Sequence, residues 1–499
     1  MTLFTSVLSD VFQFQTILAL LLGTGLGIVI GALPGLGSVV GLSICLPFTF
    51  GMETVPSVTL LLGVYCGSVF GGSISAILVN SPGTPQAAAT TLDGYPMMQR
   101  GEADIALGWA TVASVIGGII SCIVLIVAAP QLAKFATRFG SVEVFALIVL
   151  ALTCIAAVSQ NNMIKGLMMG AVGLFIAMVG TDPVTGAARF TFGTQYLTAG
   201  FDLICVVIGL FALAEALHRV AFVNNESSLV AGTRIKLPSL SQWKGRVSGL
   251  LRSSGIGCLI GALPGTGAAT AAFISYAMAR QTSPQKENLG HGEPDGIIAA
   301  EASNNAVTGS AMIPSLALGI PGDVVTAILL SALVIHGITP GVRLMAENQE
   351  TVQAIFVVLI LINLAMLVLA IPLVRCFGWL LSIPPFLVTA GIVVFGLIGA
   401  VTVRGNPLDA VTAAIFGILG YILRVTGFPL APLVIGLVLG PQFEQNLRRG
   451  LLLHDGHFLE FFYASPIAIV IFICVALAIC SPVIGVVKKK RNRSQGTSA

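Results

Sequence analysis

Polar side chains recur at helical spacing inside an apolar stretch of the second half of the sequence. The decapeptide EASNNAVTGS, residues 301–310, lies between IIAA and AMIPSLAL, and its spacing places Glu301, Asn304, Asn305 and Thr308 on one helical face. Carboxylate and carboxamide oxygens are hard ligands for a cation such as sodium, and carboxamide N–H groups can bind a carboxylate. The pattern predicts a binding face at membrane depth, with an interhelical hydrogen-bond cluster as the alternative.

Two short segments place Pro-Gly after an apolar run and a polar residue directly behind it. They are NSPGTPQAAATT at residues 80–91 and GIPGDVVTAI at residues 319–328. Each predicts the end of a helix, a tight turn and the start of another helix, with Thr84 and Asp323 at the N-cap position. Such a turn can bind a ligand, or it can be a capped surface loop. The candidate binding residues are Asn80, Ser81, Pro82, Gly83, Thr84, Gly319, Pro321, Gly322 and Asp323.

A heptapeptide occurs twice, as GALPGLG at residues 31–37 and GALPGTG at residues 261–267. Its proline removes a backbone donor, and its glycines permit positive φ. We therefore expect a broken helix in each copy. The backbone amides exposed at the break can bind an anion such as a carboxylate. The alternative is a small-residue ladder, such as Gly27, Gly31 and Gly35, that only lets helices pack closely. The candidate binding residues are Gly35, Gly37, Gly265, Thr266 and Gly267.

The composition is that of a polytopic membrane protein. Of the 499 residues, 56% are hydrophobic and 9% are charged, and the mean hydropathy is +0.98, far from the roughly 25% of charged residues in soluble domains. Apolar runs long enough to cross a bilayer recur throughout. We therefore predict an all-α integral membrane protein with roughly a dozen transmembrane helices, several of them broken.

Signals for other function classes are weak. The net charge of +3 is too small to favour nucleic-acid binding. The sequence contains no GxSxG motif, and GALPGLG lacks the GK[ST] of a phosphate-binding loop. His454 and His457 lie in a polar loop, where a lone histidine pair is weak support for a metal. We predict no enzymatic activity and no transition-metal site.

Prolines that are expected to break or end helices occur in the same order in the two halves of the chain. Pro34 and Pro264 lie 230 residues apart, Pro82 corresponds to Pro321, and the helices expected to end at prolines 130 and 372 correspond as well. Internal duplication is typical of secondary transporters, whose sites form where paired discontinuous helices meet. We predict a first membrane repeat at residues 1–223, a polar linker at 224–247, a second repeat at 248–464, and a final helix with a basic tail at 465–499.

Basic residues concentrate in two places. One is the linker, with Arg234, Lys236, Lys244 and Arg246, and the other is KKKRNR at residues 488–493. The positive-inside rule places both in the cytoplasm.

The longest motifs resemble a known family. GALPGLG, the stretch GGSISAILVNSPGTPQAAATTLDGYPMMQRGEADIALGWA at residues 71–110, GALPGTG, and the stretch at residues 301–341 resemble the large membrane subunit of the bacterial tripartite tricarboxylate transporters. The likeness covers essentially the whole chain. The family's signature glycines and prolines correspond to those of the heptapeptides and the Pro-Gly turns.

This resemblance implies a multi-pass subunit of the bacterial inner membrane that works with a small membrane subunit and a periplasmic solute-binding protein. It also implies uptake of citrate or a related carboxylate with a coupling cation, for which sodium is the expectation, and no other cofactor. We assign ion and substrate contact to the candidate residues above. The alternative is a channel-like or export permease for another small organic anion.

Overall fold

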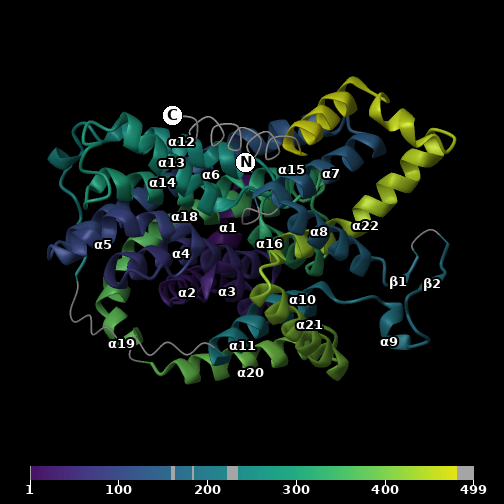
Figure 1. The fold of residues 1–499 in the computed structure, drawn as a ribbon, viewed down its shortest axis with the longest axis horizontal. Helices are drawn as coiled ribbons and strands as arrows, with labels where there is room; N and C mark the ends of the chain where they lie inside the picture. Colours follow the sequence, from purple (N-terminus) through teal and green to yellow (C-terminus); the bar gives the residue numbers. More distant parts are fainter. Residues whose placement is uncertain (1, 159–162, 183–184, 222–233, 382, 480–499) are drawn as a thin grey trace, which may run out of the picture. The chain divides into compact units, whose positions relative to one another are not determined.

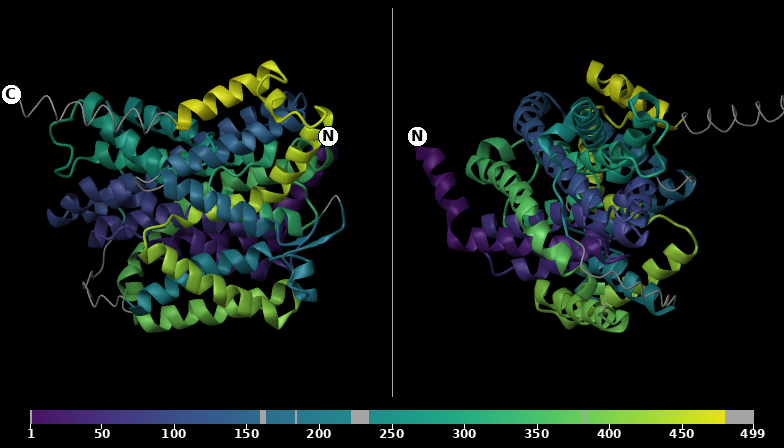
Figure 2. Two further views of the ribbon diagram at one scale, coloured as in Figure 1. Left: turned by 45° about the vertical axis from the view of Figure 1, so that its right-hand side comes forward. Right: turned by 90° about the vertical axis from the view of Figure 1, so that its left-hand side faces the viewer.

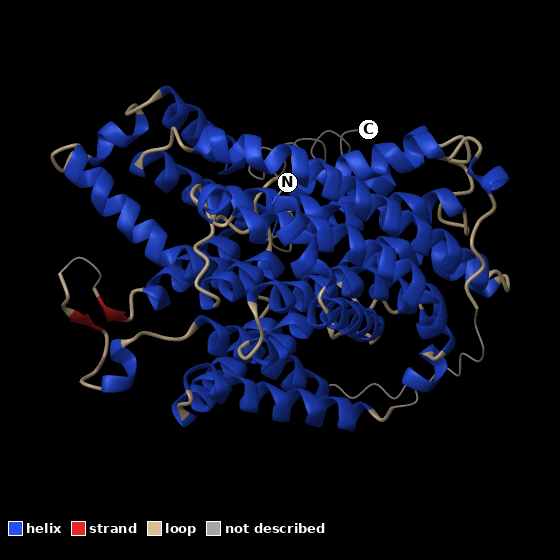
Figure 3. Ribbon diagram, turned by 180° about the vertical axis from the view of Figure 1, so that it is seen from behind, coloured by secondary structure: helices blue, strands red, loops and turns tan. Residues whose placement is uncertain are grey.

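The computed structural model describes residues 2–158, 163–182, 185–221, 234–381 and 383–479, which are almost entirely helical (Figure 3). The sheet found among them pairs β1 (Gly180–Thr181) with β2 (Ala188–Arg189) in antiparallel register. In this part of the chain, seven helices are long and apolar enough to cross a membrane, and six shorter apolar helices accompany them. The prediction of an all-α polytopic membrane protein is confirmed. Residues 224–233 of the predicted linker and the basic cluster at 488–493 lie outside the described residues.

The contacts divide the chain into two units that do not follow sequence order. Unit 1 comprises residues 1–134 and 204–422, and unit 2 comprises residues 135–203 and 423–499. Each unit therefore takes residues from both predicted repeats.

Unit 1 contains all the candidate binding residues. Its elements from the first half are α1 (Thr2–Phe12), α2 (Phe14–Ala32), α3 (Gly37–Cys45), η1 (Leu46–Thr49), α4 (Thr54–Val79), η2 (Pro85–Thr90), α5 (Thr91–Gln99), most of α6 (Ala103–Ala136), most of α10 (Leu203–Val207), the π-helical η3 (Ile208–Leu213) and α11 (Ala214–Ala221).

The second half supplies the remaining elements of unit 1. They are η4 (Leu240–Trp243), α12 (Val247–Gly261), α13 (Gly267–Thr282), α14 (Pro294–Ser310), α15 (Met312–Leu318), α16 (Val324–Ile335), α17 (Leu344–Glu347), α18 (Gln349–Arg375), α19 (Phe377–Leu381), α20 (Pro385–Arg404) and most of α21 (Pro407–Val425).

Unit 2 is smaller and is built around one long helix, α22 (Leu430–Leu453), which packs on α7 (Ser141–Val158) and α8 (Met163–Ala177). It also contains the β1–β2 hairpin, α9 (Gln195–Thr198), η5 (Phe458–Phe462) and an apolar helix at residues 466–479. Ion pairs join the hairpin segment to α22: Arg189 pairs with Glu444 over 2.6 Å and Arg448 with Asp182 over 2.8 Å.

Glycines set a close parallel packing in both halves of unit 1, where α2 lies beside α4 (Figure 1). On α2, Gly23, Gly27 and Gly31 lie against the backbone of Leu60, Val64 and Ser68 on α4, so the two helices run in the same direction. On α12, Gly257 and Gly261 face Ser303 and Val307 of α14 in the same manner, and α12, α13 and α14 lie side by side (Figure 2). Both interpretations of these glycines therefore apply. Gly27 and Gly31 pack α2 against α4, and Gly35 lies in the break that follows α2.

Two predicted helix ends are wrong. The helix α6 passes through Pro130 to Ala136, and α18 passes through Pro372 to Arg375. A proline removes one hydrogen bond to the preceding turn, and transmembrane helices tolerate that loss.

The last helix of each half packs against helices of the other half. In unit 1, Gly209 of η3 approaches the carbonyl oxygen of Ala413 on α21, and in unit 2, Gly436 of α22 approaches that of Gly170 on α8. Each glycine belongs to a VIGL sequence.

Candidate substrate and cation site

Each Pro-Gly turn lies against the heptapeptide of its own half. Asn80 and Gly319 end the preceding helices in the left-handed conformation, with φ of 53° and 71°. A side chain at Gly83 would overlap the carbonyl oxygen of Gly31 at the end of α2. In the second half, the Gly265 N–H donates to the Gly322 carbonyl oxygen over 2.6 Å. The fold therefore brings together the two kinds of motif that the sequence singles out.

Both predicted residues stand at the N-cap position, Thr84 before η2 and Asp323 before α16, but only Asp323 forms a side-chain cap. Asp323 Oδ1 accepts the Thr326 N–H over 2.8 Å, while Thr326 Oγ1 accepts the Asp323 N–H over 2.8 Å. The other oxygen, Oδ2, accepts a hydrogen bond from Tyr65 of α4 over 3.1 Å. Asp323 is therefore a cap that also joins the two halves.

The prediction that Thr84 caps a helix with its side chain is wrong. Its backbone oxygen already accepts the Ala87 N–H over 3.1 Å, and Pro85 has no N–H to offer. The Thr84 hydroxyl instead lies beside Gly72 of α4, where it is buried and has no hydrogen-bond partner among the described residues. It remains available as an oxygen ligand.

The polar face of α14 is fully buried and is joined to the first half of the chain. Glu301 and Asn304 are 0% exposed and Asn305 is 1% exposed. The Glu301 carboxylate accepts hydrogen bonds from Thr90, at the end of η2, and over 3.0 Å from Ser114 of α6. Three segments far apart in sequence thus meet at one carboxylate.

The two carboxamides extend this network. Asn304 Nδ2 lies 3.3 Å from Glu301 Oε1 and 3.4 Å from the Gln86 carbonyl oxygen. Asn305 Nδ2 donates to Asn304 Oδ1 over 2.7 Å, and the Thr308 hydroxyl donates to the Asn305 carbonyl oxygen. The alternative of an interhelical hydrogen-bond cluster is therefore realised, but it does not use every polar atom.

Three buried oxygens in this region accept no hydrogen bond from any described residue. They are Thr84 Oγ1, Gln86 Oε1 and Asn305 Oδ1. Buried acceptors are normally paired. These three oxygens could therefore act as ligands for a bound cation. Sequence reasoning missed Gln86, although it is the polar side chain inside the otherwise small-residue run PQAAA.

Both heptapeptides form the predicted breaks. Gly35 and Gly37 have φ of 84° and 64°, and Gly265 and Gly267 have φ of 85° and 70°. Thr266, a candidate ligand, donates its hydroxyl to the carbonyl oxygens of Ile260 and Leu263. These hydrogen bonds satisfy backbone carbonyl oxygens at the end of α12. They do not involve the polar face of α14.

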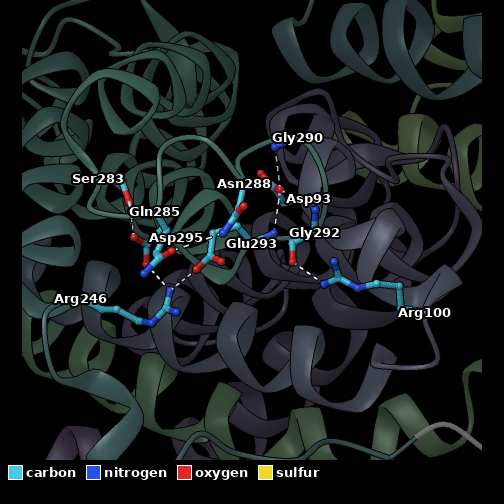
Figure 4. A network of polar contacts seen from close by, with 10 residues as sticks. All are labelled: Asp93, Arg100, Arg246, Ser283, Gln285, Asn288, Gly290, Gly292, Glu293 and Asp295. Carbon is cyan, nitrogen blue, oxygen red and sulfur yellow. Dashed lines mark hydrogen bonds and ion pairs between the residues drawn. The ribbon is translucent and has the colours of Figure 1, made fainter.

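A second polar network fixes the loop that leads into α14 (Figure 4). Asp93 of α5 accepts the backbone N–H groups of Gly290, Gly292 and Glu293 over 2.8–2.9 Å and the Tyr276 hydroxyl over 2.7 Å. Arg100 donates to the Gly292 carbonyl oxygen. This clamp positions the start of the helix that carries Glu301, and no sequence motif predicts it.

Arg246 holds the same loop from the other side. It pairs with Glu293 over 2.6 Å and with Asp295. Burial by itself lowers the pKa of Arg246, but the hydrogen bonds and charges of these two carboxylates outweigh burial and leave that pKa raised. A cavity of about 510 Å³ opens beside Arg246, Arg100 and Trp109. None of the candidate binding residues lines it.

The comparisons with known proteins agree with these motifs. A family model described as the tripartite tricarboxylate transporter TctA family matches residues 17–435. The chain belongs to this family. As a TctA family member it is a multi-pass membrane component of a transporter and not an enzyme.

Two relatives of this TctA family member come from Agrobacterium vitis. An uncharacterized 52.8 kDa protein in the TAR-I ttuC' 3' region is 36% identical over 449 residues, which is 89% of each chain. An uncharacterized protein in the TAR-II ttuC' 3' region is 35% identical over 227 residues, which is 45% of this chain and 93% of the relative. No solved structure matches.

Proposed function

We propose that this chain is the large membrane subunit of a tripartite importer that carries citrate or a related carboxylate together with Na⁺ by alternating access. Membership of the TctA family supports transport and the tricarboxylate class. The observation that carries the proposal is that the buried side-chain oxygens of Thr84, Gln86 and Asn305 have no hydrogen-bond partner among the described residues, while Asn305 lies one turn from the buried Glu301 carboxylate on α14.

The proposed cation site uses Glu301 for charge and Thr84, Gln86 and Asn305 for neutral oxygens. Sodium prefers hard oxygen ligands of this kind, and a buried carboxylate is better tolerated beside a cation. Because Gln86 of η2 and Thr84 just before it belong to the first half, and α14 belongs to the second, bound Na⁺ would join the halves and couple its binding to their arrangement.

The proposed carboxylate site uses the broken helices. The amide ends of α3 and α13 follow directly on the breaks, and a helix N-terminus attracts an anion through its free N–H groups and dipole. The Pro-Gly turns lie against these breaks, so movement of a turn would alter the shape of the site.

The proposed partners are a small membrane subunit and a periplasmic solute-binding protein, and the proposed location is the bacterial inner membrane. The tripartite character of the family supports these proposals. In this arrangement the binding protein supplies much of the substrate selectivity.

The decisive experiment is uptake of labelled citrate into proteoliposomes. The vesicles contain this chain with its small partner, the binding protein is added outside, and an inward Na⁺ gradient is present or absent. Accumulation only with both the gradient and the binding protein is expected.

Two results would contradict parts of the proposal. Accumulation without Na⁺ would remove sodium coupling, and uptake that never exceeds equilibrium would favour a channel. If citrate is not accumulated, a panel of di- and tricarboxylates tested under the same conditions decides the substrate.

A further inference from the structure

An ion pair that no motif predicts contacts the break between α2 and α3. Arg219 and Glu215 lie one turn apart on α11, and Nε of Arg219 donates to Oε1 of Glu215 over 2.9 Å. A terminal nitrogen of the same guanidinium donates to the carbonyl oxygen of Pro34. The two side chains are only 19% and 6% exposed. Arg219 therefore satisfies a carbonyl that the broken helix leaves without a helical partner.

Gly35 makes this contact possible. Its φ is 84°, and an added Cβ would lie 3.0 Å from Glu215 Oε1 and 3.1 Å from Arg219 Nη2. A larger residue would have to displace the ion pair and would also strain the backbone. The glycine thus serves the approach of the pair as well as the turn.

The charge of Arg219 suits the helix end that it contacts. A guanidinium beside the last carbonyls of α2 is favoured by the negative end of that helix dipole. Glu215 orients the guanidinium through a charge-assisted hydrogen bond. Just beyond the break, α3 begins at Gly37, and the buried hydroxyl of Ser38 in its first turn has no hydrogen-bond partner among the described residues.

The second break is held differently. Its Gly265 N–H bonds to Gly322, and the Thr266 hydroxyl satisfies the preceding carbonyls. The second half also ends with a Glu–Arg pair one turn apart, Glu444 and Arg448, but in unit 2 these residues contact Asp182 and Arg189. Their contacts do not involve a helix break.

We infer that Arg219, oriented by Glu215, is a positioning residue for the α2–α3 break. By holding the Pro34 carbonyl, it keeps the chain from reclosing into one helix and leaves the amide end of α3 available to a substrate carboxylate. The kinetic consequence rests on the proposed carboxylate transport, whereas the contact and its effect on the break do not.

The kinetic test compares Arg219→Gln, Arg219→Lys and Glu215→Gln in the full chain, with Arg448→Gln as the matched control. Loss of a hydrogen bond to a charged group changes an equilibrium by about tenfold or more, so KM for the carboxylate should rise by about tenfold in Arg219→Gln. The Na⁺ concentration for half-maximal uptake at saturating carboxylate should stay near the wild-type value. Arg219→Lys should recover part of the loss, and Arg448→Gln should leave KM unchanged.

A second readout does not depend on the substrate. Amide hydrogen exchange at residues 33–40 of the purified protein should become faster in Arg219→Gln and stay unchanged in Arg448→Gln. Wild-type exchange together with wild-type KM in Arg219→Gln would overturn the inference. If the wild-type protein transports no carboxylate, the proposed function fails. The exchange measurement then decides the role of Arg219 by itself: faster exchange in Arg219→Gln supports the inference, and unchanged exchange overturns it.

Discussion

Glu301 is the residue at which the polar contacts of the candidate site converge. Its carboxylate is buried and accepts hydrogen bonds from η2 and α6 while two carboxamides lie one turn away on its own helix. An isolated buried charge is very unfavourable, so these donors stabilise it, as the proposed cation would. Asn305 Oδ1, which has no partner among the described residues, is therefore the most direct test of the cation proposal.

Replacement of Asn305 by Ala should weaken Na⁺ binding more than carboxylate binding. We expect the half-saturating Na⁺ concentration to rise by about tenfold, because one neutral oxygen ligand is lost at about 1.4 kcal/mol. Uptake measured against Na⁺ concentration checks this. Asn446→Ala is the control, since Asn446 donates to the carbonyl four residues earlier, as Asn305 does. An unchanged Na⁺ dependence in Asn305→Ala would remove this residue from the site.

Asp323 has a structural role that can be separated from transport. Asp323→Ala removes the cap of α16 and the Tyr65 contact, so we expect a loss of about 1 kcal/mol in the free energy of unfolding. Asp323→Asn should retain most of that stability, because Asn is an equally good cap. Thermal unfolding of the purified protein in detergent measures the difference. Equal midpoints for Asp323→Ala and the wild type would contradict the cap.

At the scale of elements, the site is built from interrupted helices held by glycine contacts. The breaks after α2 and α12 and the turns after α4 and α15 lie within van der Waals or hydrogen-bond reach of one another in each half. Backbone left unpaired at membrane depth has to be buried in protein or line a polar cavity. The close approach of each turn to its break satisfies part of this requirement.

Enlarging the first turn should therefore block transport. In Gly83→Val the new side chain would overlap the Gly31 carbonyl oxygen, and the Ser75 hydroxyl lies only 2.9 Å from the added Cβ. We expect uptake to fall to background with the protein still present in the membrane. Gly25→Val on α2 is the control, because a Cβ there meets no described atom within 4 Å. Normal uptake by Gly83→Val would show that the turn is only a connection.

At the scale of the whole molecule, each unit combines helices from both halves of the sequence. Tyr65 with Asp323, Thr90 with Glu301, and Asp93 with the loop before α14 are contacts of this kind within unit 1. A ligand that binds across such contacts favours one arrangement of the halves over another. This is the property that a carrier requires and a static pore does not.

Uptake should consequently saturate with both ligands. We expect hyperbolic dependence on the carboxylate and saturable dependence on Na⁺, with accumulation abolished when an ionophore dissipates the Na⁺ gradient. Initial rates in proteoliposomes measure both dependences. A rate that rises linearly with substrate over the whole range would identify a channel-like pathway.

The sequence by itself determined the local features of this protein. Apolar length set the membrane helices, proline and glycine chemistry set the two breaks and the two turns, and helical spacing placed Glu301, Asn304 and Asn305 on one face. These features depend on residues that are neighbours along the chain. Membership of the family was evident from motifs of the same kind.

The tertiary structure alone decided which segments meet. No local pattern predicts that Thr90 and Ser114 contact Glu301, that Arg219 contacts Pro34, or that Gln86 lies beside Asn304. Such contacts join residues as much as 218 positions apart, and they follow from how glycine-faced helices pack rather than from propensity.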